Sequence, residues 1–451
     1  MAGKQRSGLA NHRKAYRCGR CLPIPIPNPI PNPNPNPIPE CPSVTLSNIA
    51  TFDGQKWILN ANTIVLACQT FTIPLGNILF IPSGIMLTNL GTHSIVNDGS
   101  ITNDGTLYNN GGAIVNNNLG NIINNNGATI INDNGGIINN SGTINNFNVI
   151  ANNNGATIAN DNGGIISNSA TPNPWFGPTI TNINNGGTIY NNGGTIINND
   201  SNIIVNDNAG TITNDNGGTI INNDSAVIIN NNTITNNTGS TITNNINGII
   251  YNNYLLTNNG TVNTFSEITN NNSASIITNN SSGVITINQG GGLINGTNFT
   301  PGGIINNNGA INNNGVINGF SSTINNNGSI NTGELSLIYI LYSTLNNNNE
   351  GTIYNSGIID NYNYSTINNN LGAIITNING GIINNLGASV IMNDNSVINN
   401  GFIYNNNSSI ITNNGTFTNT GSINNADSTS SCGYGTLNGI NPITPTGNAC
   451  P

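Results

Sequence analysis

The sequence predicts an all-β fold, a β-solenoid (β-helix) in which short strands stack coil upon coil. Three observations predict it: a phrase of six to eight residues, an aliphatic residue inside each phrase, and Asn-Gly turns between phrases. The phrase reads Gly, small residue, Ile, variable residue, Asn, Asn, as in 99–104, and it recurs between Ile95 and Ile423. Each phrase can form only one strand and one turn, and such a strand cannot bury its apolar side alone. Neighbouring phrases therefore have to stack.

A single phrase shows how the coil is built. Side chains alternate across a strand, so Ile212 should point inward while Thr211 and Thr213 point outward. The following segment 214–218 reads Asn-Asp-Asn-Gly-Gly, and asparagine and glycine tolerate the positive φ of a corner. An inward asparagine at such a corner could stack on its counterpart in the next coil, in a ladder that offsets the burial of the amide.

The period sets the dimensions of the solenoid. Phrases average roughly 7.5 residues, so a three-sided coil needs about 22 residues and a two-sided coil about 15. Three sides would give about 15 coils and a rod on the order of 70 Å long, from the spacing between strands. The sequence leaves both coil shapes open.

Composition sets the array apart from the rest of the chain. Glycine contributes 55 residues, charged residues only 5%, and asparagine about a quarter. Asparagine-rich tracts are often disordered, which is the alternative to a fold. Compositional bias alone would not place each isoleucine just before a turn, so the regular spacing favours a folded array.

Five segments follow one another along the chain. We expect a disordered basic head, a proline-rich spacer that favours polyproline II, an N-terminal β cap with larger side chains such as Phe71, the Asn-rich array, and a Cys-containing tail. Their bounds are 1–22, 23–42, 43–90, 91–427 and 428–451.

Charge limits the partners of the array. Six of the seven cations lie in the first twenty residues and the last is Lys56, so the array has no side chain to neutralise phosphates and nucleic acid is an unlikely partner for it. The basic head could bind acidic partners or simply be solvated.

No apolar run is long enough to span a membrane, and no secretory signal is seen.

Catalytic chemistry is not expected. The histidines are His12 and His93, and the acids mostly occur one per turn, so a carboxylate pair such as Asp207 and Asp215 would require facing corners. Three Asn-Asp-Asn-Gly-Gly turns offer oxygen ligands, but one carboxylate each is too little for tight Ca²⁺ binding. We expect no catalytic residues, no cofactor and no metal, and hence no enzyme.

Interruptions of the repeat are candidate contact sites. The segment 169–178 contains Trp175 and Phe176 between prolines, and we expect it to project as a contact loop or to fold back on the rod. A smaller break lies at 298–301, and 335–345 is locally more apolar, which is more typical of a core than of a contact.

The six cysteines all lie towards the ends of the chain. We expect disulfides Cys41–Cys68 and Cys432–Cys450, which leave Cys18 and Cys21 for each other or for another chain. The alternative is zinc, although Cys-x-x-Cys with distant single cysteines is at best half of a structural site.

Doubled isoleucines suggest self-association. Strict alternation lets only one residue of each pair enter the core. The other would join an apolar stripe on which uncharged rods could pack side by side, unless a bulge buries both. The pairs are 130–131, 137–138, 165–166, 196–197 and 220–221.

The segment 71–89, followed by Gly-Thr-Ile-Thr-Asn-Asn phrases, resembles the cap and array of Asn-rich β-solenoid repeat proteins. These proteins occur as surface or fibre proteins of giant amoebal DNA viruses and as bacterial adhesins. The resemblance covers residues 70–425 and brings no catalytic residue with it. It implies a structural rod at a virion or particle surface, or, failing that, one exported by a non-classical route.

We therefore expect a stiff rod that forms or decorates a surface fibre or filament by self-association. The alternative is an adhesin-like module that binds a glycan or a host-surface receptor through projecting loops. Ice binding would need a regular Thr-x-Thr file, and the motifs at 211–213, 233–235 and 241–243 are too irregularly spaced.

Overall fold

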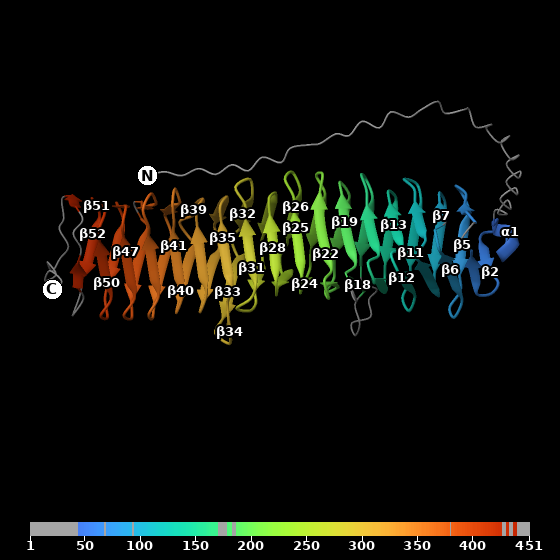
Figure 1. Cartoon of the computed structure of the whole chain (residues 1–451), viewed down its shortest axis with the longest axis horizontal. Coiled ribbons are helices and arrows are strands. Elements are labelled where there is room, and N and C mark those ends of the chain that lie inside the picture. Colours follow the sequence, from blue (N-terminus) through green and yellow to red (C-terminus); the bar gives the residue numbers. More distant parts are fainter. Residues whose placement is uncertain are drawn as a thin grey trace, which may run out of the picture. The chain divides into compact units, whose positions relative to one another are not determined.

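The fold is a three-sided parallel β-solenoid, so the predicted all-β class is confirmed. The structure, a computed structural model, describes residues 44–66, 69–92, 94–169, 178–182, 186–378, 380–425, 430–432 and 436–439. Within these ranges the chain forms one short helix, α1 (Leu46–Ile49), and a succession of short strands. Figure 1 shows the strands stacked into one long series of coils. Each coil contributes one strand to each of three sheets, which decides between the two coil shapes that the sequence left open.

The three sheets, here named A, B and C, run the length of the stack. Sheet A contains β4 (Phe71–Ile73), β7 (Ser94–Asn97), β10 (Ala113–Asn116), β13 (Ile137–Asn140), β16 (Thr157–Asn160), β19 (Thr188–Asn192), β22 (Thr211–Asp215), β25 (Thr233–Asn236), β28 (Leu255–Asn258), β31 (Ile276–Asn279), β35 (Ile304–Asn307), β38 (Thr323–Asn326), β41 (Thr344–Asn347), β44 (Thr366–Asn369), β47 (Val390–Asn393), β50 (Ile410–Asn413) and β53 (Ser430–Cys432). Sheet B contains β1 (Ala50–Phe52), β2 (Trp57–Leu59), β5 (Ile78–Ile81), β8 (Ser100–Asn103), β11 (Asn121–Asn124), β14 (Thr143–Asn146), β17 (Ile165–Asn168), β20 (Thr195–Asn198), β23 (Thr219–Asn222), β26 (Thr241–Asn244), β29 (Thr261–Thr264), β32 (Val284–Ile287), β36 (Ala310–Asn313), β39 (Ser329–Thr332), β42 (Thr352–Asn355), β45 (Ile374–Asn377), β48 (Ser396–Asn399), β51 (Thr416–Asn419) and β54 (Thr436–Gly439). Sheet C contains β3 (Thr63–Val65), β6 (Met86–Leu90), β9 (Thr106–Asn110), β12 (Thr129–Asp133), β15 (Val149–Asn152), β18 (Thr179–Asn182), β21 (Ile203–Asn206), β24 (Val227–Asn230), β27 (Ile249–Asn252), β30 (Glu267–Asn270), β33 (Gly292–Thr297), β37 (Val316–Phe320), β40 (Leu337–Leu341), β43 (Ile358–Tyr362), β46 (Ile382–Leu386), β49 (Phe402–Asn405) and β52 (Ser422–Asn425), with β34 (Thr300–Pro301) attached to β33.

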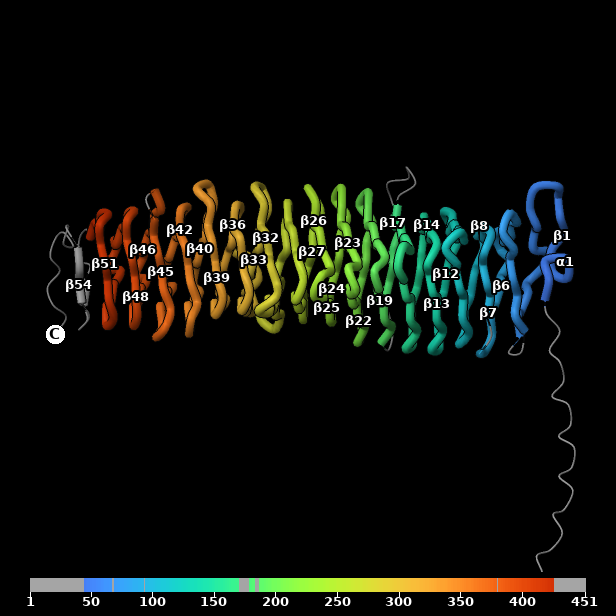
Figure 2. Tube along the Cα trace, turned by 90° about the horizontal axis from the view of Figure 1, so that it is seen from above, coloured from blue at the N-terminus to red at the C-terminus, as the bar shows by residue number. Residues whose placement is uncertain are grey.

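Equivalent residues of successive coils lie directly opposite each other. Ile212 faces Ile189 in the preceding coil and Ile234 in the next, in parallel register. Asn214 bonds to Asn236, 22 residues further along the chain, which matches the three-sided period. Figure 2 shows the coils following one another as a regular tube. At about 4.8 Å per coil the described array extends on the order of 80 Å.

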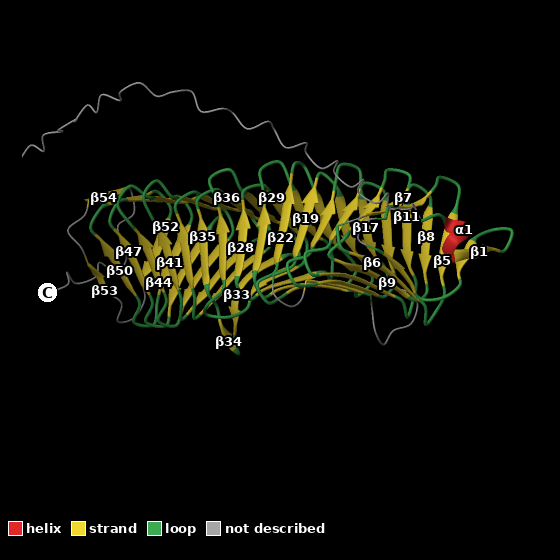
Figure 3. Ribbon diagram, turned by 45° about the vertical axis from the view of Figure 1, so that its right-hand side comes forward, coloured by secondary structure: helices red, strands yellow, loops and turns green. Residues whose placement is uncertain are grey.

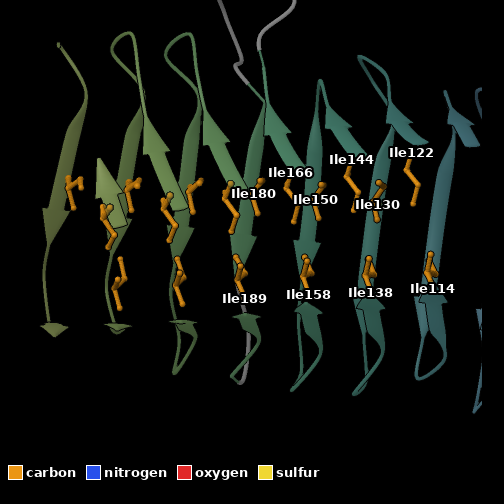
Figure 4. Close-up of a pocket in the computed structure, with 18 of the residues that line it drawn as sticks. Ile114, Ile122, Ile130, Ile138, Ile144, Ile150, Ile158, Ile166, Ile180 and Ile189 are labelled. Atoms are coloured by element: carbon orange, nitrogen blue, oxygen red, sulfur yellow. The ribbon is translucent and has the colours of Figure 1, made fainter. Parts of the chain in front are cut away.

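The core consists of columns of aliphatic side chains. Burial alternates along nearly every strand, and in β22 Ile212 is buried while Thr211 and Thr213 are half-exposed. Figure 4 shows Ile114, Ile138 and Ile158 in one such column, pointing into the coil. The free space among these columns from Leu107 to Leu256 is only about 30 Å³, room for one or two water molecules. The interior is therefore a packed core and not a channel.

Asparagine ladders line the corners. In sheet A the Nδ2 of Asn191 donates to Oδ1 of Asn214 at 2.7 Å, and Asn214 in turn donates to Asn236 at 2.8 Å. Most of these Nδ2 groups also donate to backbone carbonyls at the start of the following strand, in their own coil and in the next, as Asn214 does to Gly218 and Thr241. Burial of the amide is therefore offset by hydrogen bonds, as the sequence predicted.

At one corner of the coil, the buried side chains change from asparagine to other residues towards the C-terminus. In sheet C the asparagine position is taken by Gly319 in β37 and by the buried Ile340 in β40. Beside this gap, between sheets C and A, buried serines stack instead: the Ser322 amide donates to Oγ of Ser343 at 3.0 Å, and the Ser343 amide donates to Oγ of Ser365 at 3.1 Å. The ladder continues through Ser389. A serine column thus replaces the glycines of earlier coils.

Many glycines are required by close packing and not by positive φ. A Cβ on Gly142 would lie 2.2 Å from the carbonyl oxygen of Gly120 in the preceding coil. Gly217, in contrast, has φ +81 and open space around it, so there the backbone conformation favours glycine. The sequence argument recognised only this second class.

The first coils carry a small cap. Strands β1 and β2 form an antiparallel hairpin beside α1, while β2 already pairs in parallel with β5. Phe71, in the region predicted as a cap, is fully buried in the shared core. The indole Nε1 of Trp57 donates to Asn77 at 3.1 Å, and Lys56 Nζ lies 4.0 Å from the centre of the Phe80 ring. Parallel coils thus begin well before residue 91, and at the other end β53 and β54 extend them into the predicted tail.

A hairpin projects from the stack at 296–301, the smaller break noticed in the sequence. Gly296 pairs with Pro301 in antiparallel register between β33 and β34, and Phe299 at its tip is 95% exposed. Figure 3 shows β34 standing out from the body of the solenoid.

The doubled isoleucines obey strict alternation, and none of the five pairs is buried by a bulge. The residue outside is the second of the pair at Ile131, Ile197 and Ile221, but the first at Ile137 and Ile165. These five lie on three different sheets, so the single stripe expected from the sequence is wrong. In each of these strands the second residue enters the core, so the position of the pair within its strand decides which isoleucine lies outside.

Candidate binding surfaces

The described part of the chain brings no catalytic group of side chains together. Asp207 follows β21 at the corner between sheets C and A, whereas Asp215 ends β22 at the corner between sheets A and B. The two carboxylates therefore occupy different corners of the coil. Of the histidines considered in the sequence, His12 and His93 lie outside the described residues.

In the Asn-Asp-Asn-Gly-Gly turns, the aspartate carboxylates accept hydrogen bonds from asparagines of neighbouring coils. Oδ1 of Asp133 accepts from Asn154 of the next coil at 2.6 Å, and Asp161 accepts from Asn192 at 3.1 Å. Among the described residues no three His, Cys, Asp or Glu side chains are grouped so that they could hold a metal ion. The carboxylates act as ladder acceptors on the surface.

Two of these carboxylates also accept from tyrosines. The phenol of Tyr190 donates to Asp215 at 3.0 Å, and this bond raises the pKa of Tyr190 above its usual value of 10.0. Burial, followed by the charge of Asp133, raises the pKa of Tyr108. Both phenols are therefore held in the neutral, donating form.

The outer faces of the three sheets differ in character. Thr211-x-Thr213 and Thr233-x-Thr235 are neighbours on sheet A, but Thr241-x-Thr243 lies on sheet B. A continuous threonine file is therefore not formed by these motifs. Sheet C is the more apolar face, with a mid-rod patch formed by the outward side chains of Ile203, Val205, Val227, Ile229, Ile249 and Tyr251.

Aromatic side chains gather further along the rod, on sheet C and at its corner with sheet A. We name five of them the aromatic file: Phe320, Tyr339, Tyr342, Tyr362 and Tyr364. Tyr342 stacks on Tyr364 with ring centres 6.4 Å apart and planes 14° apart, and the Phe320 ring meets Tyr342 edge-on at 6.1 Å. Tyr339 stacks on Tyr362 at 6.4 Å. The file thus spans three successive coils, from β37 through β40 to β43, which lie in the orange part of Figure 1.

Two tyrosines of the file have an unusual backbone. Tyr342 has φ 50 and Tyr364 has φ 59, which is rare for a bulky residue. At the equivalent corner of earlier coils, Gly111 precedes β10 where Tyr342 precedes β41, and Asn134-Gly135-Gly136 corresponds to Asn363-Tyr364-Ser365. Tyrosine thus stands at positions where glycine would adopt the same backbone conformation with less strain.

Sequence reasoning missed this file. It assigned the apolar segment 335–345 to the core. Ile338, Ile340 and Leu345 do lie there, but Tyr339 and Leu341 point outward, and Leu335 is 85% exposed in the preceding turn. The available signals were the change from Asn-Gly-Gly to Asn-Tyr-Ser and the density of tyrosines between 339 and 364.

The sites predicted from the sequence lie largely outside the described residues. These are the contact loop with Trp175 and Phe176, and the cysteines Cys41, Cys68 and Cys450. Cys432 ends β53, opposite Thr412, but its side chain is not described. The disulfide pairings stay a prediction, which mass mapping of the unreduced protein would test.

Comparison with known proteins gives little guidance. The sequence matches no protein-family model and no curated protein. Among solved structures, a TibC-catalysed hyper-glycosylated fragment, TibA55-350, matches 79% of this chain and 100% of its own, with 14% identity and a TM-score of 0.21. A TM-score this low does not establish a shared architecture. In the described ranges, no helix has the length and apolar character needed to cross a bilayer.

Proposed function

We propose that the protein is a non-catalytic structural rod that forms or decorates a surface fibre or filament. The observation that carries the proposal is the continuity of the stack. Sheet A pairs coil by coil from β4 to β53, and an asparagine ladder follows its corner from Asn97 to Asn413. Each coil is stabilised mainly by its two neighbours, so repetition of the coil produces a long and stiff rod.

Attachment at the N-terminal end is the second part of the proposal. The basic head at 1–22 and the proline-rich spacer at 23–42 suit a tether, because polyproline II is stiff and extended. The proposed tether and the resemblance to surface-fibre repeat proteins support display on a virion or particle surface. The alternative location is extracellular, reached by a non-classical export route.

Lateral packing would turn single rods into filaments. The mid-rod patch offers an apolar contact surface, and Lys56 is the only cation among the described residues, so no lysine or arginine keeps copies apart along the array. Replacing Val205 and Ile229 by lysine should disperse assemblies without unfolding the rod. Thr213→Lys on sheet A is the matched control.

Negative-stain images of the purified protein test the proposal. We expect straight particles on the order of 80 Å long, or filaments built from them. Flexible or globular particles would contradict the rod. Rods that remain monomeric in light scattering at high concentration would leave the rod intact but rule out the filament.

A further inference from the structure

We propose that the aromatic file binds an extended, neutral carbohydrate chain lying along the rod. The file offers flat rings at repeated intervals on a rigid surface, and the apolar C–H faces of sugar rings stack on such rings. This site lies at the end of sheet C and at its corner with sheet A, and it does not include Trp175.

Backbone strain points to a function for the tyrosines. In other coils this corner closes with glycine, as at Gly135 with φ 73, or with a small residue, as at Ala388 with φ 58 and Ser408 with φ 63, so a bulky residue is the exception there. Tyr364 keeps the left-handed conformation at φ 59 although its side chain is 74% exposed. An exposed side chain contributes little packing to offset an unfavourable backbone, and such outliers gather at binding sites. The retained strain is explained if the phenol rings are needed at this surface.

The backbone that carries the rings is held in place before any ligand arrives. The Tyr342 amide donates to the carbonyl of Asn363 in the next coil at 3.3 Å, and the Tyr364 amide donates to Gly387 at 3.0 Å. Beneath them, the amide of Ser343 donates to Ser365. A prearranged aromatic surface loses little conformational entropy on binding.

The charge of the surroundings selects a neutral ligand. The array contains no lysine or arginine, so sulfated, phosphorylated or nucleic-acid chains would meet no counter-charge. Asp360, opposite Tyr339 in the register, accepts from Asn384 at 2.6 Å and presents a carboxylate acceptor beside the rings. Burial, with Tyr362 and Asp360 nearby, raises the pKa of Tyr339 and keeps its phenol protonated as a donor. Hydroxyl groups match this mixture of donors and acceptors.

A second copy of the chain fits the same surface less well. Two files placed face to face would bring Asp360 of one rod towards Asp360 of the other, with no cation to compensate. The face is also open, which suits a polymer that crosses several coils better than a small molecule, since small molecules prefer enclosed pockets.

Affinity electrophoresis of the full chain through cellulose derivatives, mannan, starch and soluble chitin tests the proposal. We expect at least one neutral polysaccharide to retard the protein, and the double variant Tyr342→Gly/Tyr364→Gly to bind at least tenfold more weakly. Glycine suits the backbone at both positions, so this variant should melt no lower than the wild type. Tyr354→Ala, at an outward tyrosine on sheet B, should bind as the wild type does.

Several outcomes would overturn the proposal. Retardation by none of the neutral polymers, or only by a sulfated one such as dextran sulfate, would exclude the neutral glycan. Undiminished binding by the double variant at wild-type melting temperature would place the site elsewhere. Oligomers in light scattering that dissociate in the double variant, without polysaccharide binding, would make a second copy the occupant.

Discussion

At the scale of the residue, alternation along a four-residue strand separates two roles. Ile212 and Asn214 point inward, where the first is 3% exposed and the second fully buried, while Thr211 and Thr213 remain at the surface. The isoleucine contributes apolar burial, about 1.5–3 kcal/mol for a side chain of this size. The asparagine contributes no such gain and depends on its hydrogen bonds.

A charge in the isoleucine column should unfold the array locally. Ile212→Asp would place an unpaired carboxylate among Ile189 and Ile234, at a cost of several kcal/mol. Thr213→Asp, on the outer face of the same strand, should change the free energy of unfolding by no more than about 0.5 kcal/mol. Chemical denaturation measures both, and equal effects would contradict the inward assignment.

Breaking one rung of a ladder should be costly although only a small polar side chain is removed. Asn214→Ala leaves the Nδ2 of Asn191 and the Oδ1 of Asn236 without this partner, so we expect a loss of about 1–3 kcal/mol. Thr211→Ala is the control from the same strand. A loss no larger than that of the control would show that the ladder adds nothing to stability.

At the scale of the element, the residues of each turn decide how neighbouring coils contact each other at that corner. Corners with glycine let the coils approach closely, whereas corners with serine bind the next coil through hydroxyl groups. Aspartates at the strand ends and outward tyrosines within the strands add contacts between coils on the outside. The bond from Tyr190 to Asp215 joins β19 to β22 in this way.

The Tyr190 bond predicts a loss of stability in alkali. The folded state raises the pKa of Tyr190 above 10.0, so it favours the protonated phenol relative to the unfolded chain. The stabilisation is therefore fully present below about pH 10 and disappears as the pH rises through the raised folded pKa. Thermal melts between pH 8 and 11 should show a shallower alkaline decline for Tyr190→Phe than for the wild type. Identical declines would refute the assignment.

At the scale of the whole molecule, the solenoid is almost one-dimensional, because each coil contacts mainly its two neighbours. Length can therefore vary without a change of fold. The insertions tolerated between β17 and β18 and at the β33–β34 hairpin lie at corners, where they leave the sheets in register. Any side chain repeated at one position becomes a row along the rod, as the aromatic file shows.

Removing one complete coil should shorten the rod and preserve the fold. Deletion of residues 211–232 brings Thr233 opposite Thr188, the position that Thr211 occupies now. We expect a cooperative melt close to that of the wild type and a particle shorter by about 4.8 Å in small-angle scattering. Deletion of 211–221, half a coil, should destroy the register and lower the melting temperature sharply. Equal stability of the two deletions would contradict the three-sided period.

The sequence by itself determined the class of fold, the inward isoleucines and the asparagine corners, because each follows from local alternation and turn chemistry. Ile212 could be placed from its two neighbours, and Asn214 from the turn that follows it. Such information repeats in every phrase, so a single chain contains many copies of the same evidence. This redundancy is why so much could be predicted.

Only the tertiary structure decided the number of sides, the glycines at close approach, and which residues share a face. Ile137 begins its strand and is exposed, whereas Ile130 stands second in its strand and is buried, and two neighbouring apolar letters do not record this difference. Tyr342 and Tyr364 are 22 residues apart in the sequence and stack only because one coil takes about that length. Contacts between coils depend on the period of the whole turn, and that period is fixed by packing around the closed coil.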